Sequence, residues 1–249
     1  MIPYIASTVI HLGPVPIRTW GLFVGLGFLC GTWMAARRAH RVGLDANIVW
    51  DLAAWLLVAA MAGARIFHVL FYDFSYYVQH PLAALDPRAP GYAIYGGFLA
   101  CAFVFWRYIK KHQLDFLSYA DALIWGVPLG CGIGRIGCFL IHDHPGTLTS
   151  FTLGVKYPDG TVRHDLGLYL SIVGFTIAIL FFAFDRRRRE PGFWFGLFLI
   201  LDGASRILLD FLRTADRHIL GLTPTQWLTI PLVVIGIWIV VKKPSSSRE

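Results

Sequence analysis

Long apolar runs separated by short polar segments form the main pattern along this chain. The runs cover residues 17–36, 47–72, 91–108, 119–139, 166–184, 193–211 and 225–241. A helix of about 20 apolar residues crosses the hydrocarbon core of a bilayer, and it satisfies its own backbone hydrogen bonds, which lipid cannot do. The pattern therefore predicts an all-α membrane protein with seven transmembrane helices.

The composition agrees with lipid as the solvent. Charged residues make up 15% of the chain, whereas soluble proteins carry about 25%. The net charge of +7 does not indicate a nucleic-acid partner, because the basic residues lie between apolar runs and form no single stripe.

The basic residues also predict an orientation, because clusters follow the first, third, fifth and seventh runs. The positive-inside rule places these connections in the cytoplasm, which puts the N-terminus outside and the C-terminus in the cytoplasm. The clusters are Arg37, Arg38 and Arg41, then Arg107, Lys110 and Lys111, then Arg186 to Arg189, and finally Lys242, Lys243 and Arg248. The other connections hold Arg18, Arg88, Lys156, Arg163, Arg213 and Arg217, scattered over longer stretches.

We expect a single transmembrane domain over residues 1–244, followed by a polar tail at 245–249. The longest non-apolar stretch, residues 140–165, is predicted to form a small external head between spans four and five. Its Lys-Tyr-Pro-Asp-Gly segment at 156–160 is typical of a turn between two short strands.

Three arginines, Arg65, Arg135 and Arg206, lie within or at the outer end of a span. A charge at membrane depth costs at least about 2.5–3.5 kcal/mol and usually faces a bundle interior or an aqueous cavity. Arg206 shares one helix face with Asp202 and Asp210, so it is either a neutralised structural residue or a guanidinium held in a fixed pose. Arg65 could instead snorkel or form a structural ion pair.

Arg135 stands in a glycine-rich segment. Gly126, Gly130 and Gly134 have the spacing that lets helices approach closely, and Gly134 and Gly137 also leave space around Arg135. Arginine suits bidentate phosphate recognition and stays charged when desolvated.

His142, Asp143 and His144 follow near the outer interface. Acid–base work or phosphate hydrogen bonding suits them. A metal would need a third ligand such as His164 or Asp165, but the spacing is not a known metal motif, and the four cysteines form no CxxC pair. No metal and no cofactor are expected.

Several ordered segments resemble the bacterial prolipoprotein diacylglyceryl transferase family along nearly the whole chain. They are Ile17 to Leu22, Gly63 to Ile66 with Leu70 to Tyr72, Gly134 to Phe139 ending at Gly146, Arg163-His164 with Leu168-Tyr169, Gly203 to Arg206, and Thr225 to Pro231. The family moves diacylglyceryl from phosphatidylglycerol to the lipobox cysteine thiol of a prolipoprotein signal peptide and releases glycerol phosphate.

The resemblance implies a multi-pass enzyme of the bacterial cytoplasmic (inner) membrane, whose site opens to the outer half of the bilayer and needs no cofactor. Arg135 and Arg206 would bind the lipid phosphate and stabilise the departing glycerol phosphate. Gly146 matches the last glycine of the signature. Further candidates for substrate binding are Trp20, Arg65, Gly96, Gly97, Arg163, His164 and Tyr169.

The chain departs from the family pattern at several positions. Tyr95 stands where the family has histidine, Cys138 replaces asparagine, Asp143 replaces glutamate, Trp20 replaces tyrosine, and Leu170 follows Tyr169 where the family has glutamate. Our hypothesis is that His142 or His144 takes the thiol proton, with Asp143 orienting it. Alternatively, Tyr95 only hydrogen-bonds the lipid headgroup and the thiol loses its proton to water.

Two other functions stay open. The chain could be a paralogue with a different acceptor or lipid, or a non-catalytic phospholipid-binding scaffold that keeps the arginines without a base. A transporter is less favoured, because no inverted repeat is visible.

Overall fold

The computed structural model describes residues 1–86, 91–185, 189–214 and 220–242. Every predicted apolar run is a helix in this structure. The long helices are α1 (Thr19–Arg41), α2 (Ala46–Phe71), α4 (Ile94–Lys111), α5 (Phe116–Ile141), α6 (Leu166–Phe184), α7 (Phe193–Asp210) and α8 (Pro224–Val241). Two short helical segments that the sequence did not predict, α3 (Phe74–Gln79) and the 3-10 helix η1 (Pro81–Leu85), follow α2.

Among the described residues, five helices are long and apolar enough to cross a membrane: α1, α2, α5, α6 and α8. The chain is therefore a multi-pass membrane protein. The helices α4 and α7 have the same length as α8, but each carries three charged residues. The predicted count of seven spans depends on these two helices.

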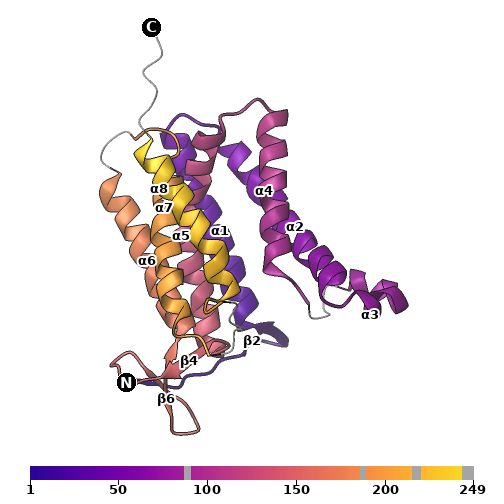
Figure 1. Ribbon diagram of the computed structural model, residues 1–249, viewed down its shortest axis with the longest axis vertical. Helices are drawn as coiled ribbons and strands as arrows, with labels where there is room; N and C mark the ends of the chain where they lie inside the picture. Colours follow the sequence, from indigo (N-terminus) through magenta and orange to yellow (C-terminus); the bar gives the residue numbers. More distant parts are fainter. Residues whose placement is uncertain (87–90, 186–188, 215–219, 243–249) are drawn as a thin grey trace.

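Glycines set the packing around α5, which contacts α1, α6 and α7. A Cβ on Gly130 would lie 2.7 Å from the Gly27 carbonyl oxygen, and one on Gly126 would collide with the Gly31 carbonyl oxygen. The small-residue spacing predicted for α5 therefore does bring it against α1. The helices α7 and α8 pack together beside this group, whereas α2 and α4 pair with each other and diverge from the bundle (Figure 1).

A small β structure covers one end of the bundle (Figure 1). Its four-stranded sheet has the order β1 (Ile2–Pro3), β5 (Val155–Lys156), β6 (Val162–Asp165) and β4 (Pro145–Leu148), with β1 parallel to β5 and the other pairs antiparallel. The predicted turn joins β5 to β6, and Gly160 there has a φ of 81°. The participation of the N-terminal strand β1 was not predicted. A hairpin of β2 (Val9–Leu12) and β3 (Val15–Arg18) leads into α1.

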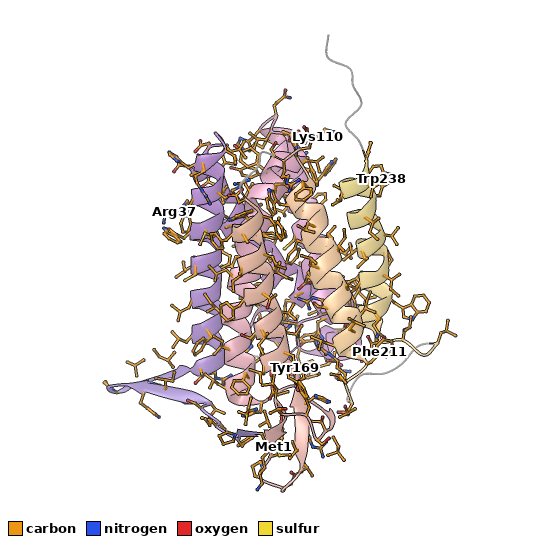
Figure 2. All side chains as sticks on the ribbon, turned by 90° about the vertical axis from the view of Figure 1, so that its left-hand side faces the viewer. Met1, Arg37, Lys110, Tyr169, Phe211 and Trp238 are labelled. Atoms are coloured by element: carbon orange, nitrogen blue, oxygen red, sulfur yellow. The ribbon has the colours of Figure 1, made fainter. Side chains whose placement is uncertain are left out.

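Basic residues gather at the opposite end, where Figure 2 labels Arg37 and Lys110, while Met1, Tyr169 and Phe211 lie toward the β end. There Arg38 pairs with Asp185 and lies 4.5 Å from the ring centre of Trp125. The grouping agrees with the predicted alternation of charge. Arg88, Arg186 to Arg188, Arg217, Lys243, Arg248 and the tail at 245–249 fall outside the described residues.

Candidate functional site

The signature segment ends α5 in a left-handed turn. His142, the residue after the helix, has a φ of 50°, and its N–H donates to the Phe139 carbonyl oxygen at 3.3 Å. A left-handed residue stops a helix and reverses the chain. The reversal returns the next two residues to the last turn of α5, so that ligand-type atoms of Cys138, Asp143 and His144 lie within 4.8 Å of one another.

Arg135 lies one helical turn before Cys138 and is half-buried, with its Nη1 atom 3.8 Å from the Cys138 sulfur. Among the residues that the structure describes, that sulfur is its only hydrogen-bond partner and no carboxylate pairs with it. A partly desolvated guanidinium without a carboxylate partner suits an incoming phosphate, which can accept two parallel hydrogen bonds.

Arg206 on α7 is held differently. Its Nε donates to Asp202 at 2.5 Å, one turn earlier on the same helix, a pairing that both sequence interpretations involve. Asp210 is not part of that pair: it is buried, accepts from the Thr223 hydroxyl at 2.6 Å and pairs with Arg213 at 2.9 Å. The expected group of three charges is thus divided between two ion pairs, Asp202 with Arg206 and Asp210 with Arg213.

Arg135 and Arg206 belong to helices that contact each other, α5 and α7. The charges of Asp202, Arg206 and Arg135 all act on the Cys131 thiol of α5. The two guanidiniums that the sequence singled out thus lie on contacting helices, and the charges of both reach the same thiol.

His142 is buried in the head and is oriented by Asp165, not by Asp143. Its Nδ1 lies 2.7 Å from Asp165 Oδ2, and its ring stacks on Tyr4 with centroids 4.2 Å apart. Asp165 also accepts from the Leu168 N–H at 3.0 Å and from the Tyr157 hydroxyl at 3.3 Å. This corrects the expectation that Asp143 could orient His142. An aspartate directly before an apolar run is an N-cap signal that would have identified Asp165.

His144 is the accessible member of the histidine pair. About a third of its side chain is exposed, and its Nε2 lies 3.8 Å from Asp143 Oδ2. Burial lowers the pKa of His144, and the charges of Arg135 and Arg213 lower it further, while Asp143 opposes them. The imidazole of His144, kept neutral by burial and by the charges of Arg135 and Arg213, can accept a proton.

The start of α1 closes the same part of α5. A Cβ on Gly137 would lie 3.2 Å from the Trp20 Cα, so the glycine lets α1 approach within one turn of Arg135. The Trp20 side chain itself is 47% exposed.

Tyr95, Gly96 and Gly97 begin α4 and lie against α2. A Cβ on Gly96 would collide with the Gly63 carbonyl oxygen, and one on Gly97 would lie 3.2 Å from the Ala60 oxygen. Both glycines are buried and Tyr95 is half-buried. The paired glycines therefore provide the close backbone approach expected of them, and they do so between α2 and α4.

Arg65 is 8% exposed and binds backbone at the connection from α2 to α4. Its guanidinium donates to the carbonyl oxygens of Ala83 at 2.6 Å, Ala84 at 3.0 Å and Gly91 at 3.0 Å. These contacts favour the structural interpretation of Arg65.

The remaining candidates line the boundary between the head and the bundle. His164 Nδ1 lies 2.8 Å from the Tyr169 hydroxyl, and a Cβ on Gly146 would lie 3.1 Å from the His164 Cβ. Gly146 also forms a β-bridge with Arg213 after α7. Arg163 instead faces its own hairpin, where its Nε donates to Thr161 at 3.0 Å.

Comparison with known proteins identifies the family of this chain. A sequence model described as prolipoprotein diacylglyceryl transferase matches residues 7–242. Proteins named phosphatidylglycerol–prolipoprotein diacylglyceryl transferase are similar throughout. The protein from Nitratidesulfovibrio vulgaris is 32% identical over 95% of this chain and 94% of its own. The protein from Chromohalobacter salexigens is 32% identical over 94% of this chain and 91% of its own. The protein from Bacillus cytotoxicus is 30% identical over 100% of this chain and 96% of its own.

The matched segment includes the helices that carry Arg135 and Arg206 and the turn at His142 to His144. With this coverage, the chain belongs to the prolipoprotein diacylglyceryl transferase family.

Proposed function

We propose that this protein transfers diacylglyceryl from phosphatidylglycerol to the lipobox cysteine thiol of prolipoproteins and releases glycerol phosphate. The observation that carries the proposal is the half-buried Arg135 guanidinium, which has no carboxylate partner among the described residues and whose helix contacts the helix that bears Arg206. Family membership supplies the substrates.

In the proposed reaction, the thiolate sulfur attacks the glycerol carbon that bears the phosphate ester. A carbon–sulfur bond forms, the carbon–oxygen bond breaks, and its electron pair leaves on the phosphate oxygen. Arg135 donates to the phosphate, and Arg206, held by Asp202, adds positive charge nearby. Fixed charges in a water-poor site stabilise developing negative charge far more than they would in water.

His144 is the proposed base, with Asp143 beside it. Its accessible, neutral imidazole supports this choice over His142, which Asp165 and Tyr4 enclose. The alternative keeps Tyr95 as a hydrogen-bond donor to the headgroup and lets water take the proton. The proposed substrate-binding set further includes Trp20, Gly96, Gly97, Gly146, Arg163, His164 and Tyr169. Arg65, bound to backbone carbonyl oxygens, keeps a structural role.

The proposed setting is the bacterial cytoplasmic membrane, crossed seven times by one transmembrane domain over residues 1–244. The N-terminus and the head (residues 140–165) face outward and the C-terminus faces the cytoplasm. The alternating basic clusters and the position of the β sheet at one end of the bundle support this orientation.

The test uses purified protein, phosphatidylglycerol labelled in its acyl chains, and a lipobox peptide. We expect label on the peptide as a thioether, and none on a matched peptide whose lipobox cysteine is serine. Folded protein that labels neither peptide would refute the transfer.

A second candidate is a paralogue with another acceptor or lipid, which the residues Tyr95 and Cys138 favour because they replace the family's histidine and asparagine. Exchanging acceptor peptides and headgroups in the same assay separates the two. Lipid binding with no transfer to any acceptor would instead support a non-catalytic scaffold.

A further inference from the structure

The cluster of Cys138, Asp143 and His144 has a composition that phosphate binding does not require. One thiol sulfur, one carboxylate oxygen and one imidazole nitrogen lie within 4.8 Å of one another. The sulfur is on the last turn of α5, and the other two groups come from the reversed chain after His142. The thiol is buried, whereas the carboxylate and the imidazole are each about one third exposed.

These three donors are ligands that zinc prefers. Zinc takes cysteine sulfur at about 2.3 Å and histidine nitrogen or carboxylate oxygen at about 2.0–2.2 Å, in tetrahedral geometry. Adjacent ligands of such an ion are about 3.4–3.6 Å apart, and the Asp143 Oδ2 to His144 Nε2 distance is 3.8 Å. The Cys138 sulfur lies within 4.8 Å of the other two ligand atoms, so the two partly exposed side chains would move toward it by at most about 1.2–1.4 Å to complete the shell.

The surrounding charge is compatible with a dication. A thiolate and a carboxylate together neutralise it, and Arg213, the other cation acting on His144, is paired with Asp210 at 2.9 Å. Arg135 Nη1, 3.8 Å from the sulfur, is placed to donate to the thiolate as an outer-shell partner. Three protein ligands leave the fourth position open to water or to a phosphate oxygen.

We propose that Cys138, Asp143 and His144 form a binding site for a thiophilic divalent cation, zinc in particular. We also infer that the bound ion blocks diacylglyceryl transfer, because it occupies the His144 imidazole and the space beside Arg135. The second statement rests on the proposed function, and the first does not.

Binding is measured without lipid or acceptor, on full-length, tag-free protein in detergent micelles. Calorimetry with Zn²⁺ should show one high-affinity site, and Co²⁺ should give a thiolate-to-metal charge-transfer band. Loss of an outer-shell partner weakens metal binding about 10–100-fold, so Cys138→Ser and His144→Gln, which remove a ligand, should weaken Zn²⁺ binding at least that much. Cys131→Ser and His11→Gln are matched controls on the same chain, and both should bind like wild type.

The site is refuted if Cys138→Ser and His144→Gln bind Zn²⁺ as wild type does, or if the Co²⁺ complex lacks the charge-transfer band. Should the buried Cys138→Ser substitution prevent folding, the partly exposed His144→Gln variant decides the matter. Mg²⁺, which prefers oxygen ligands, should not compete.

Inhibition is tested separately in the transfer assay. Zn²⁺ should slow the wild-type protein, and a chelator should restore the rate. The acceptor thiol can itself bind zinc, so the transfer rate with Zn²⁺ is divided by the rate without it for each protein. This ratio should fall well below one for wild type and stay near one for Cys138→Ser. Equal slowing of both proteins would overturn the blocking role, while absence of transfer in wild type would count against the proposed function and leave the binding result intact.

Discussion

At the scale of single residues, the three arginines of the apolar runs differ in the groups that bind their guanidiniums. Backbone carbonyl oxygens hold Arg65, and a carboxylate holds Arg206. Arg135 has only a weak sulfur acceptor among the described residues. Since an unpaired charge in an apolar bundle is costly, the arginine with the poorest protein partner gains most from an anionic ligand.

Arg135→Lys tests that argument. Lysine keeps the charge but loses the planar fork that binds phosphate in a bidentate manner. Removing one donor from a site that stabilises an oxyanion costs about 100–1,000-fold in rate, and we expect a loss of that order in the rate of transfer. Arg41→Lys, at the opposite end of the bundle and 52% exposed, is the matched control and should retain the wild-type rate. A normal rate for Arg135→Lys would refute bidentate binding.

The base is identified by pH dependence. Burial lowers the pKa of His144 from 6.5, so the imidazole is neutral at pH 7 and becomes protonated only as the pH falls through the lowered pKa. The value of kcat/KM should therefore decline on the acid side below pH 6.5. His144→Gln should remove this acid-side decline and lower kcat/KM about 100-fold or more, as the loss of a general base does. An unchanged acid limb in His144→Gln would favour water or Tyr95.

At the scale of elements, α5 organises the site because its glycines accept α1 and α6 at backbone contact. The reason lies in specific pairs: Gly126 meets Gly31, and Gly132 meets Gly174, whose added Cβ would lie 2.7 Å from the Gly132 nitrogen. This packing fixes α5, which bears Arg135, relative to α1 and α6.

Gly126→Ala should separate α1 from α5, since the new Cβ would collide with the Gly31 carbonyl oxygen. Overpacking typically costs about 1–3 kcal/mol, which should lower the midpoint of thermal unfolding in micelles. Gly25→Ala places the same group on α1 with nothing within 4 Å and should leave stability unchanged or raise it slightly. Equal effects of the two substitutions would contradict the packing argument.

Asp165 joins the head to α6. It caps the helix through Leu168 and binds His142 and Tyr157. Loss of a cap costs about 0.5–2 kcal/mol, and each buried donor left without a partner adds about 1–3 kcal/mol. We therefore expect Asp165→Ala to destabilise the protein by about 2–4 kcal/mol in denaturant titration. Asp159→Ala, on the exposed turn of the same hairpin, should have little effect, and a comparable loss there would undermine this role of Asp165.

At the scale of the whole molecule, the apolar pattern predicted the seven long helices because lipid demands long apolar runs. The glycine spacing predicted a close helix approach to α5 but not that α1 would be the partner. Contacts between distant segments were not predictable. The pairing of β1 with β5, the bond between His142 and Asp165, and the return of Asp143 and His144 to Cys138 all depend on chain reversals. Hydrophobic periodicity carries no signal for such reversals, and the absence of a CxxC spacing concealed the donor set around Cys138.

The number of spans turns on α4 and α7, whose three charges each raise the cost of insertion. Single cysteines at Asp86, Gln113, Glu190 and Leu220 flank these two helices, and Asp159→Cys reports on the head. Labelling above the wild-type background by a membrane-impermeant maleimide should reach positions 86, 159 and 220 in intact cells, and positions 113 and 190 only after permeabilisation. If positions 86 and 113 are labelled from the same side, α4 does not cross the membrane. If positions 190 and 220 are labelled from the same side, α7 does not cross it. The reverse pattern at all five positions would invert the orientation derived from the basic clusters.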